Sequence, residues 1–158
     1  MAIRHISFRR DMQEAIDAGT KTMTRRPVKP QPVWDADGGC WYPARHHKRA
    51  RHYANEDHFR RGMPLDFPRY SPGDRFVVLD RACEITAVRV ERVQSISDAD
   101  VRAEGISEAA IDKWRQWLHP NDCAGHAFSE IWDLKYRKTF PWASNCYVWR
   151  VTFRRIET

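Results

Sequence analysis

Two stretches in which apolar and polar residues alternate constrain the fold of this 158-residue chain most strongly. Residues 84–93 form the first stretch. Residues 145–156 form the second, in which Tyr147, Trp149 and Val151 fall on one face. A period of two is typical of β-strands that bury one face and expose the other. The core of the fold is therefore predicted to contain two long strands.

Shorter segments predict the remaining elements. A strand is expected at residues 3–8, and the Ser-Pro-Gly-Asp turn at 71–74 introduces another at 75–79. Short helices are expected at residues 10–18, 97–105, 107–118 and 125–136. Several strands with short helices between them predict an α+β fold built on a small, partly open β-barrel.

Residues 27–72 differ in composition from the rest of the chain. They hold seven of its nine prolines together with Gly38, Gly39 and Gly62, and they have no clear hydrophobic period. We therefore expect a long irregular insertion at about 27–72 within a single domain that spans residues 1–158.

The positive charge of the chain is unevenly distributed. Residues 1–70 hold 14 Lys and Arg against 8 Asp and Glu, whereas the remaining residues hold 13 of each, so the net charge of +6 lies in the N-terminal part. Such an excess fits contact with phosphate or another anion. It fits a basic surface without a partner equally well.

Residues 44–61 interleave cations and four histidines with Tyr53 and Phe59. Cations beside aromatic rings are typical of sites for single-stranded nucleic acid, and a solvated basic loop is the alternative. The candidate nucleic-acid contacts are Arg45, Lys48, Arg49 and Arg51. The spacing of these histidines from Cys40 matches no compact ligand set, so neither a metal nor another cofactor is expected.

The chain carries no sequence signal for a membrane or for secretion. No apolar run approaches the length of a membrane span, and the first residues lack the apolar centre of a signal peptide. The four cysteines are widely scattered, which is typical of reduced thiols. We therefore expect a cytoplasmic protein without a membrane partner.

Residues 18–26, with the sequence AGTKTMTRR, place a lysine, three threonine hydroxyls and two arginines side by side. In a regular strand Lys21 and Thr24 would point to opposite faces, so a shared pocket requires a bend or a bulge between them. The alternative is an edge strand with solvated cations, because threonine-rich alternation suits a half-exposed strand.

The order of these landmarks resembles the ASCH domain family of the PUA-like superfamily, and in particular its phage-type and prophage-type members. The resemblance rests on the GTKTMTRR string, the SPGD turn, the strand at 84–93, the AEGI sequence at 103–106 and the closing strand. It implies a PUA-like β-barrel and an association with RNA. The chain departs from the pattern after the turn at 71–74 and in residues 27–72.

The resemblance also implies a catalytic set. The bacterial N4-acetylcytidine amidohydrolases of this family use a lysine and a threonine in a GxKTxT string and a glutamate at a helix end. These positions correspond here to Lys21, Thr24 and Glu104. The implied activity is removal of the acyl group from N4-acylated cytosine nucleosides. A module that binds RNA or a modified base without catalysis, and a ribonuclease, are the alternatives.

Two mechanisms fit these three residues. In the first, Thr24 attacks the acyl carbon, Lys21 accepts its proton, and Glu104 protonates the leaving amine. In the second, Glu104 activates water, while Lys21 stays charged and Thr24 polarises the carbonyl. The expected cleft is lined by residues 20–26, the helix end at Glu104 and part of 71–80. The candidate substrate-binding residues are Arg25, Arg26, Arg75 and Trp142.

Overall fold

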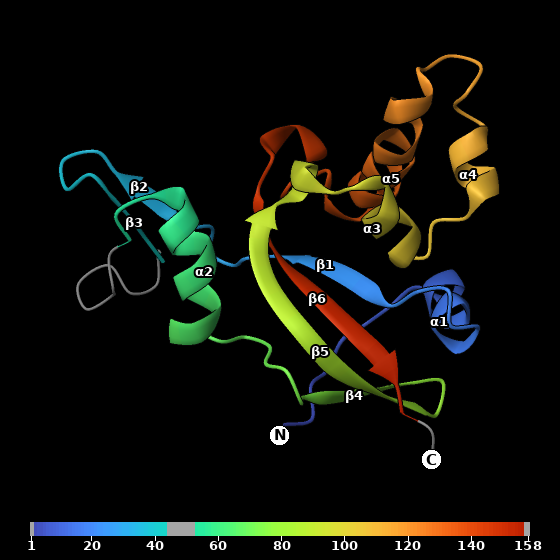
Figure 1. Ribbon diagram of the computed structural model, residues 1–158, viewed down its shortest axis with the longest axis horizontal. Helices are drawn as coiled ribbons and strands as arrows, with labels where there is room; N and C mark the ends of the chain where they lie inside the picture. Colours follow the sequence, from blue (N-terminus) through green and yellow to red (C-terminus); the bar gives the residue numbers. More distant parts are fainter. Residues whose placement is uncertain (1, 44–52, 157–158) are drawn as a thin grey trace.

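The computed structural model describes residues 2–43 and 53–156 and has an α+β architecture. Its main sheet is antiparallel and curls into a half-barrel (Figure 1). In spatial order its strands are β1 (Met23–Pro27), β6 (Tyr147–Arg155), β5 (Arg81–Arg92) and β4 (Arg75–Val78). The register of β5 on β6 shifts between Ile85 and Ala87, and such an irregularity increases the local twist. β1 and β4 are the edge strands of this sheet.

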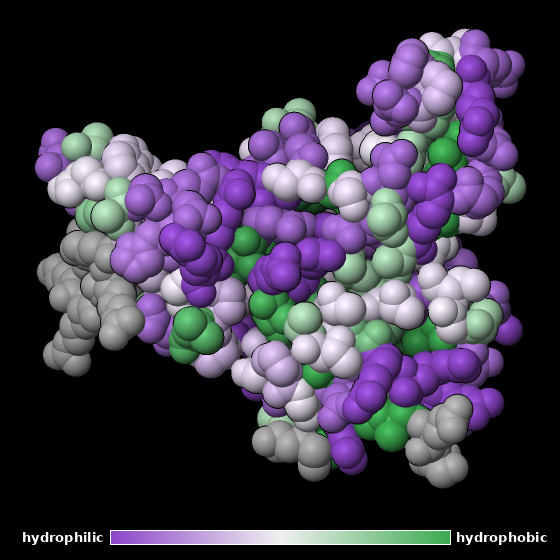
Figure 2. Space-filling model, in the orientation of Figure 1, coloured by the Kyte–Doolittle hydropathy of each residue, from purple (hydrophilic) through white to green (hydrophobic). Residues whose placement is uncertain are grey.

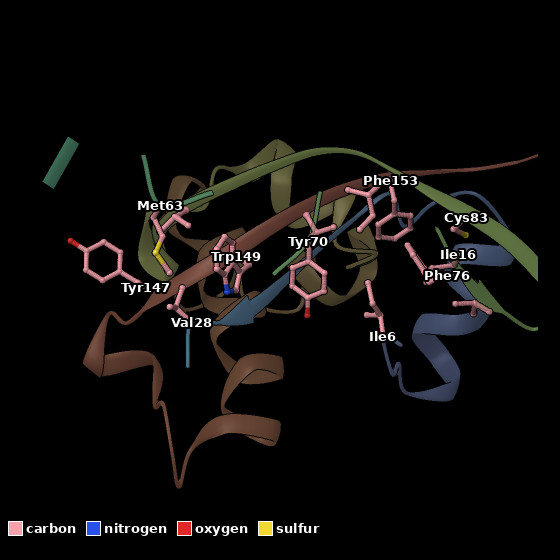
Figure 3. Close-up of a cluster of buried hydrophobic side chains, with 14 of the residues drawn as sticks. Ile6, Ile16, Val28, Met63, Tyr70, Phe76, Cys83, Tyr147, Trp149 and Phe153 are labelled. Carbon is pink, nitrogen blue, oxygen red and sulfur yellow. The ribbon is translucent and has the colours of Figure 1, made fainter. Parts of the chain in front are cut away.

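The two long alternating segments form β5 and β6, as predicted. The side chains of β6 alternate between two hydrophobic clusters, one on each face of the sheet. Tyr147, Trp149, Val151 and Phe153 belong to a cluster on one face of the sheet (Figure 3). Val148 belongs to a second cluster on the other face. Because successive side chains of a strand point to opposite faces, β6 contributes to both clusters.

Helices cover both faces of the sheet. The helix α1 (Arg10–Asp17) places Ile16 in the first cluster. The second cluster is covered by α3 (Asp98–Ala103), α4 (Glu108–Asp112) and α5 (Pro120–Tyr136). The helix α5 begins earlier than predicted because Pro120 is favourable in a first helical turn.

The prediction of irregular structure throughout residues 27–72 was wrong. This segment contains β2 (Val33–Asp35), β3 (Cys40–Tyr42) and α2 (Glu56–Asp66). Pro64 lies inside α2, where proline is normally unfavourable. Packing compensates, because the buried ring of Phe59 contacts the aromatic rings of Trp41, Tyr53 and Tyr147. Tertiary contacts therefore override the local signals of proline and glycine.

The expected opening strand at residues 3–8 was also wrong, apart from one bridge in which Ile3 pairs with Arg75. Asp74 anchors this segment instead. Its carboxylate accepts hydrogen bonds from the backbone N–H of Ala2 (2.9 Å) and from Nε of Arg4 (2.6 Å).

The surface in the view of Figure 2 is mainly hydrophilic, and its hydrophobic side chains form small separate patches. Within residues 2–43 and 53–156, no helix combines the length and the apolar character needed to cross a membrane. Arg45, Lys48, Arg49 and Arg51 lie outside the described residues, so their predicted role stays a prediction.

Candidate active site

The chain turns sharply before β1, and this turn positions Lys21. Gly19, with φ of +80°, ends α1, and the backbone N–H groups of Thr20 and Lys21 both donate to the carbonyl of Ala15 (2.9 and 3.0 Å). Lys21 then forms an isolated antiparallel bridge with Glu104, and β1 begins two residues later at Met23. Lys21 therefore precedes the regular strand, and its side chain lines the same cavity as that of Thr24.

Glu104 caps the C-terminal end of α3, and the following glycine allows Lys21 to approach it. Gly105 has φ of +88°, a conformation that L side chains rarely adopt. A Cβ atom at Gly105 would also lie 3.0 Å from Cβ of Lys21. Glycine is thus required here both for the backbone turn and for the close contact of the two segments.

The Lys21 amine lies in a nearly closed polar environment. The residue is only 4% exposed, and Nζ donates to the carbonyls of Met23 and Glu104 (both 2.7 Å) and to Oε2 of Glu104 (2.9 Å). These acceptors match the three protons of an ammonium group. Burial lowers the pKa of Lys21, the negative charge of Glu104 opposes this effect, and Arg26 and Arg25 lower the pKa further.

Arg25 connects the site to the sheet through three carboxylates. Its fully buried guanidinium contacts Glu91 (2.6 Å), Asp100 (2.6 Å) and Glu104 (3.2 Å). Burial lowers the pKa of Arg25, but the carboxylates outweigh burial and raise it overall. Asp100 also pairs with Arg150 at 3.0 Å. With its donors directed at these groups, Arg25 holds Glu104 in place.

Thr24 is in contact with Arg26 rather than with Lys21. The buried hydroxyl of Thr24 accepts a hydrogen bond from Nη1 of Arg26 at 2.6 Å. Nη2 of Arg26 donates to the carbonyl of Ser7 (2.8 Å), and its guanidinium lies 5.1 Å from the ring centroid of Phe8. Because Oγ1 of Thr24 is the acceptor in this bond, its own proton is available for donation.

These polar groups line a small cavity of about 80 Å³. Its apolar walls come from Phe8, Met12, Ile106, Phe128, Ile131, Trp132 and Tyr136. Pockets that enclose a drug-sized ligand measure roughly 300–1,000 Å³. The cavity can therefore enclose only part of a nucleoside, such as a planar ring or an acyl group.

The structure brings five of the predicted site residues to this cavity: Lys21, Thr24, Arg25, Arg26 and Glu104. Two others lie elsewhere. Arg75 is an exposed residue of β4, and Trp142 packs against Phe128 with ring centroids 5.8 Å apart. Neither is among the residues that line the cavity. The expected contribution of residues 71–80 to the cleft was therefore wrong for this cavity.

Sequence reasoning missed the contributions of Phe8 and of α5. Phe128, Ile131, Trp132, Lys135 and Tyr136 recur at helical spacing and all line the cavity. This spacing was visible in the sequence, but an apolar helical stripe is also the pattern of a core-facing helix. Glu91 and Asp100 form ion pairs with Arg25, but no motif or spacing in the sequence marks them as residues of the site.

No protein-family model and no curated protein matches the chain. A solved structure described as an ASCH domain from Lactobacillus crispatus JV V101 aligns with 98% of this chain and 78% of its own chain, at 10% sequence identity and a TM-score of 0.49.

Proposed function

We propose that the chain is an ASCH-type, PUA-like amidohydrolase that removes the acyl group from N4-acylated cytosine nucleosides. One observation carries this proposal: a buried Lys21–Glu104 pair and the Thr24–Arg26 contact line the same small cavity. Buried charges are costly and are often retained where they perform chemistry. An apolar cavity with a few convergent polar groups is a typical ligand site.

The contacts favour the mechanism in which Glu104 activates water. The Lys21 amine directs its protons at acceptors of Met23 and Glu104, and no hydrogen bond joins it to Thr24. Lys21 is thus placed to orient the carboxylate rather than to deprotonate Thr24. The Glu104 carboxylate accepts a proton from water, and the oxygen of that water attacks the acyl carbon.

The remaining groups complete the reaction. The Thr24 hydroxyl and the Arg26 guanidinium donate to the carbonyl oxygen, on which negative charge develops in the tetrahedral intermediate. When the C–N bond breaks, Glu104 returns its proton to the exocyclic nitrogen of cytosine. The products are the cytosine nucleoside and a carboxylic acid. Phe8, Trp132 and Tyr136 supply apolar walls for the planar base.

The test is incubation of the purified protein with N4-acetylcytidine, followed by chromatographic measurement of cytidine and acetate. Glu104→Gln preserves the shape of the side chain but removes its proton exchange, and it should slow turnover by about a hundredfold or more. Glu108→Gln is the matched control, because Glu108 pairs with Arg102 on the exposed surface. The proposal fails if the wild type releases no cytidine, or if Glu104→Gln matches the wild type.

A further inference from the structure

A second, larger cavity lies beside β1 and has a basic lining. Its volume is about 660 Å³, and it is bordered by residues 3–5, 28–30 and 67–70 together with Trp149. We call it the basic groove. Three cationic side chains and one histidine line it: Arg4, Lys29, Arg69 and His5. None of the described residues that line it is acidic.

Two of these cations have no carboxylate partner within residues 2–43 and 53–156. Lys29 and Arg69 are both exposed, and each is instead close to an aromatic ring. Nζ of Lys29 lies 5.4 Å from the ring centroid of Phe140, and the guanidinium of Arg69 lies 5.6 Å from that of Tyr70. Arg4, by contrast, is paired with Asp74. Nε of Arg69 donates to the Tyr70 hydroxyl at 3.4 Å. The Lys29 amine and the remaining N–H groups of Arg69 can therefore bind an anion from solution.

The floor of the groove is buried and aromatic. Tyr70 and Trp149 are both buried and lie in an edge-to-face arrangement with ring centroids 6.3 Å apart. Figure 3 shows them next to each other within the first hydrophobic cluster, with Val28 and Met63 nearby. A packed floor of this kind fixes the backbone from which the cations of the groove project.

The groove adjoins the candidate active site across β1. Arg26 lines the active-site cavity and pairs in register with Trp149, which lines the groove. Lys135 lies at the active-site cavity, and loss of solvent together with the charges of Arg26, Lys29 and Lys21 lowers its pKa to about 8. These cations are thus near enough to repel one another. A bound anion would relieve that repulsion.

We infer that the basic groove binds the phosphate of the substrate, so that the enzyme acts on a phosphate ester of the acylated cytosine nucleoside in preference to the free nucleoside. This inference rests on the proposed function. It also accounts for the small size of the active-site cavity. The base and its acyl group enter the cavity, while the sugar-phosphate part lies along Lys29 and Arg69.

The test measures binding separately from turnover. Dissociation constants are determined by calorimetry for cytidine, cytidine 5′-monophosphate and a single-stranded tetracytidylate, none of which carries an acyl group to be hydrolysed. The phosphate-bearing ligands should bind roughly tenfold or more tightly than cytidine, and their affinity should fall as salt rises. A tetranucleotide that binds more tightly than the mononucleotide identifies a strand as the ligand. Equal affinity identifies a single phosphate.

Charge-matched variants locate the binding. The double variant Lys29→Gln/Arg69→Gln should weaken binding of the phosphate-bearing ligands roughly tenfold and reduce the salt dependence. The control Arg89→Gln/Lys113→Gln removes the same charge outside both cavities and should bind like the wild type. Equal affinity of cytidine and its phosphates, or unchanged binding by the groove variant, would overturn the inference. Neither result depends on hydrolysis, so failure of the proposed function would appear separately in the acetylcytidine assay.

Discussion

Nζ of Lys21 lies 2.9 Å from Oε2 of Glu104, and both side chains are more than nine-tenths buried. The two residues are 83 positions apart in the chain, and backbone hydrogen bonding holds their segments together, since the N–H of Thr22 donates to the carbonyl of Ala103 at 2.8 Å. Arg25 contacts the other carboxylate oxygen of Glu104. The orientation of Glu104 is therefore fixed by contacts to both carboxylate oxygens, as its proposed role in acid–base catalysis requires.

Replacing Lys21 should disturb both the chemistry and the fold. Lys21→Arg keeps the charge, but the larger planar guanidinium does not match three acceptors arranged around one nitrogen atom. Lys21→Met keeps the approximate length and removes the charge. We expect acetylcytidine turnover to fall by about a hundredfold or more in both variants. We also expect both variants to have a lower thermal midpoint of unfolding than the wild type. Full activity of Lys21→Arg would show that orientation of Glu104 by this amine is unimportant.

Replacing Thr24 distinguishes the two mechanisms. If Thr24 only donates a hydrogen bond to the oxyanion, Thr24→Ala should cost about a hundredfold in kcat, and Thr24→Ser should retain most of the activity. If Thr24 is the nucleophile, Thr24→Ala should remove nearly all turnover. Mass spectrometry of the wild type quenched during turnover checks the assignment directly, because a covalent acyl-enzyme would contradict the water mechanism.

Replacing Arg25 tests how much the same network of buried ion pairs contributes to the stability of the fold. Arg25→Met leaves Glu91, Asp100 and Glu104 without their shared cation and should reduce the free energy of unfolding by about 3–5 kcal/mol. Arg61→Met is the control, because Arg61 pairs with Asp57 on the exposed surface and should change stability by less than about 1 kcal/mol. Urea denaturation of both variants measures the difference. Equal small losses would show that the contacts of Arg25 with these carboxylates do not stabilise the fold.

The fold and the site differ in how far they could be predicted from the sequence. Alternation located β5 and β6, because burial of one face leaves a period-two pattern. The GTKTMTRR string marked Lys21 and Thr24, but the turn that unites them depends on contacts of Ala15 and Ala103, which are distant from each other in sequence. The helix α2 was missed because Phe59 is stabilised by rings from other elements, and local propensity does not include such contacts.

Lys135 lines the active-site cavity, but its charge acts on Lys29 of the basic groove, so its protonation should affect the affinity for a phosphate bound there. Because its pKa is lowered to about 8, this amine is protonated below that pH and loses its charge as the pH rises through it. The affinity for cytidine 5′-monophosphate should therefore fall between about pH 7 and 9, a range in which the ligand charge is nearly constant. The variant Lys135→Gln should bind more weakly at pH 7 and lack this pH step. Identical pH profiles of the variant and the wild type would show that Lys135 does not contribute to binding of the phosphate.

Two glycines provide a matched test of the turn that places Glu104. Gly105→Ala must adopt φ of +88° and approach Cβ of Lys21 to 3.0 Å, so it should lose about 1–3 kcal/mol of stability and most of the acetylcytidine turnover. Gly125 lies inside α5, and a Cβ atom there would meet no neighbour within 4 Å. Because alanine favours a helix interior over glycine by about 1 kcal/mol, Gly125→Ala should raise the thermal midpoint and leave turnover unchanged. The thermal midpoints of the two variants and their initial rates of acetylcytidine hydrolysis are compared with those of the wild type. A Gly105→Ala protein as stable and active as the wild type would mean that the contact between the Lys21 segment and the end of α3 is not required for the site.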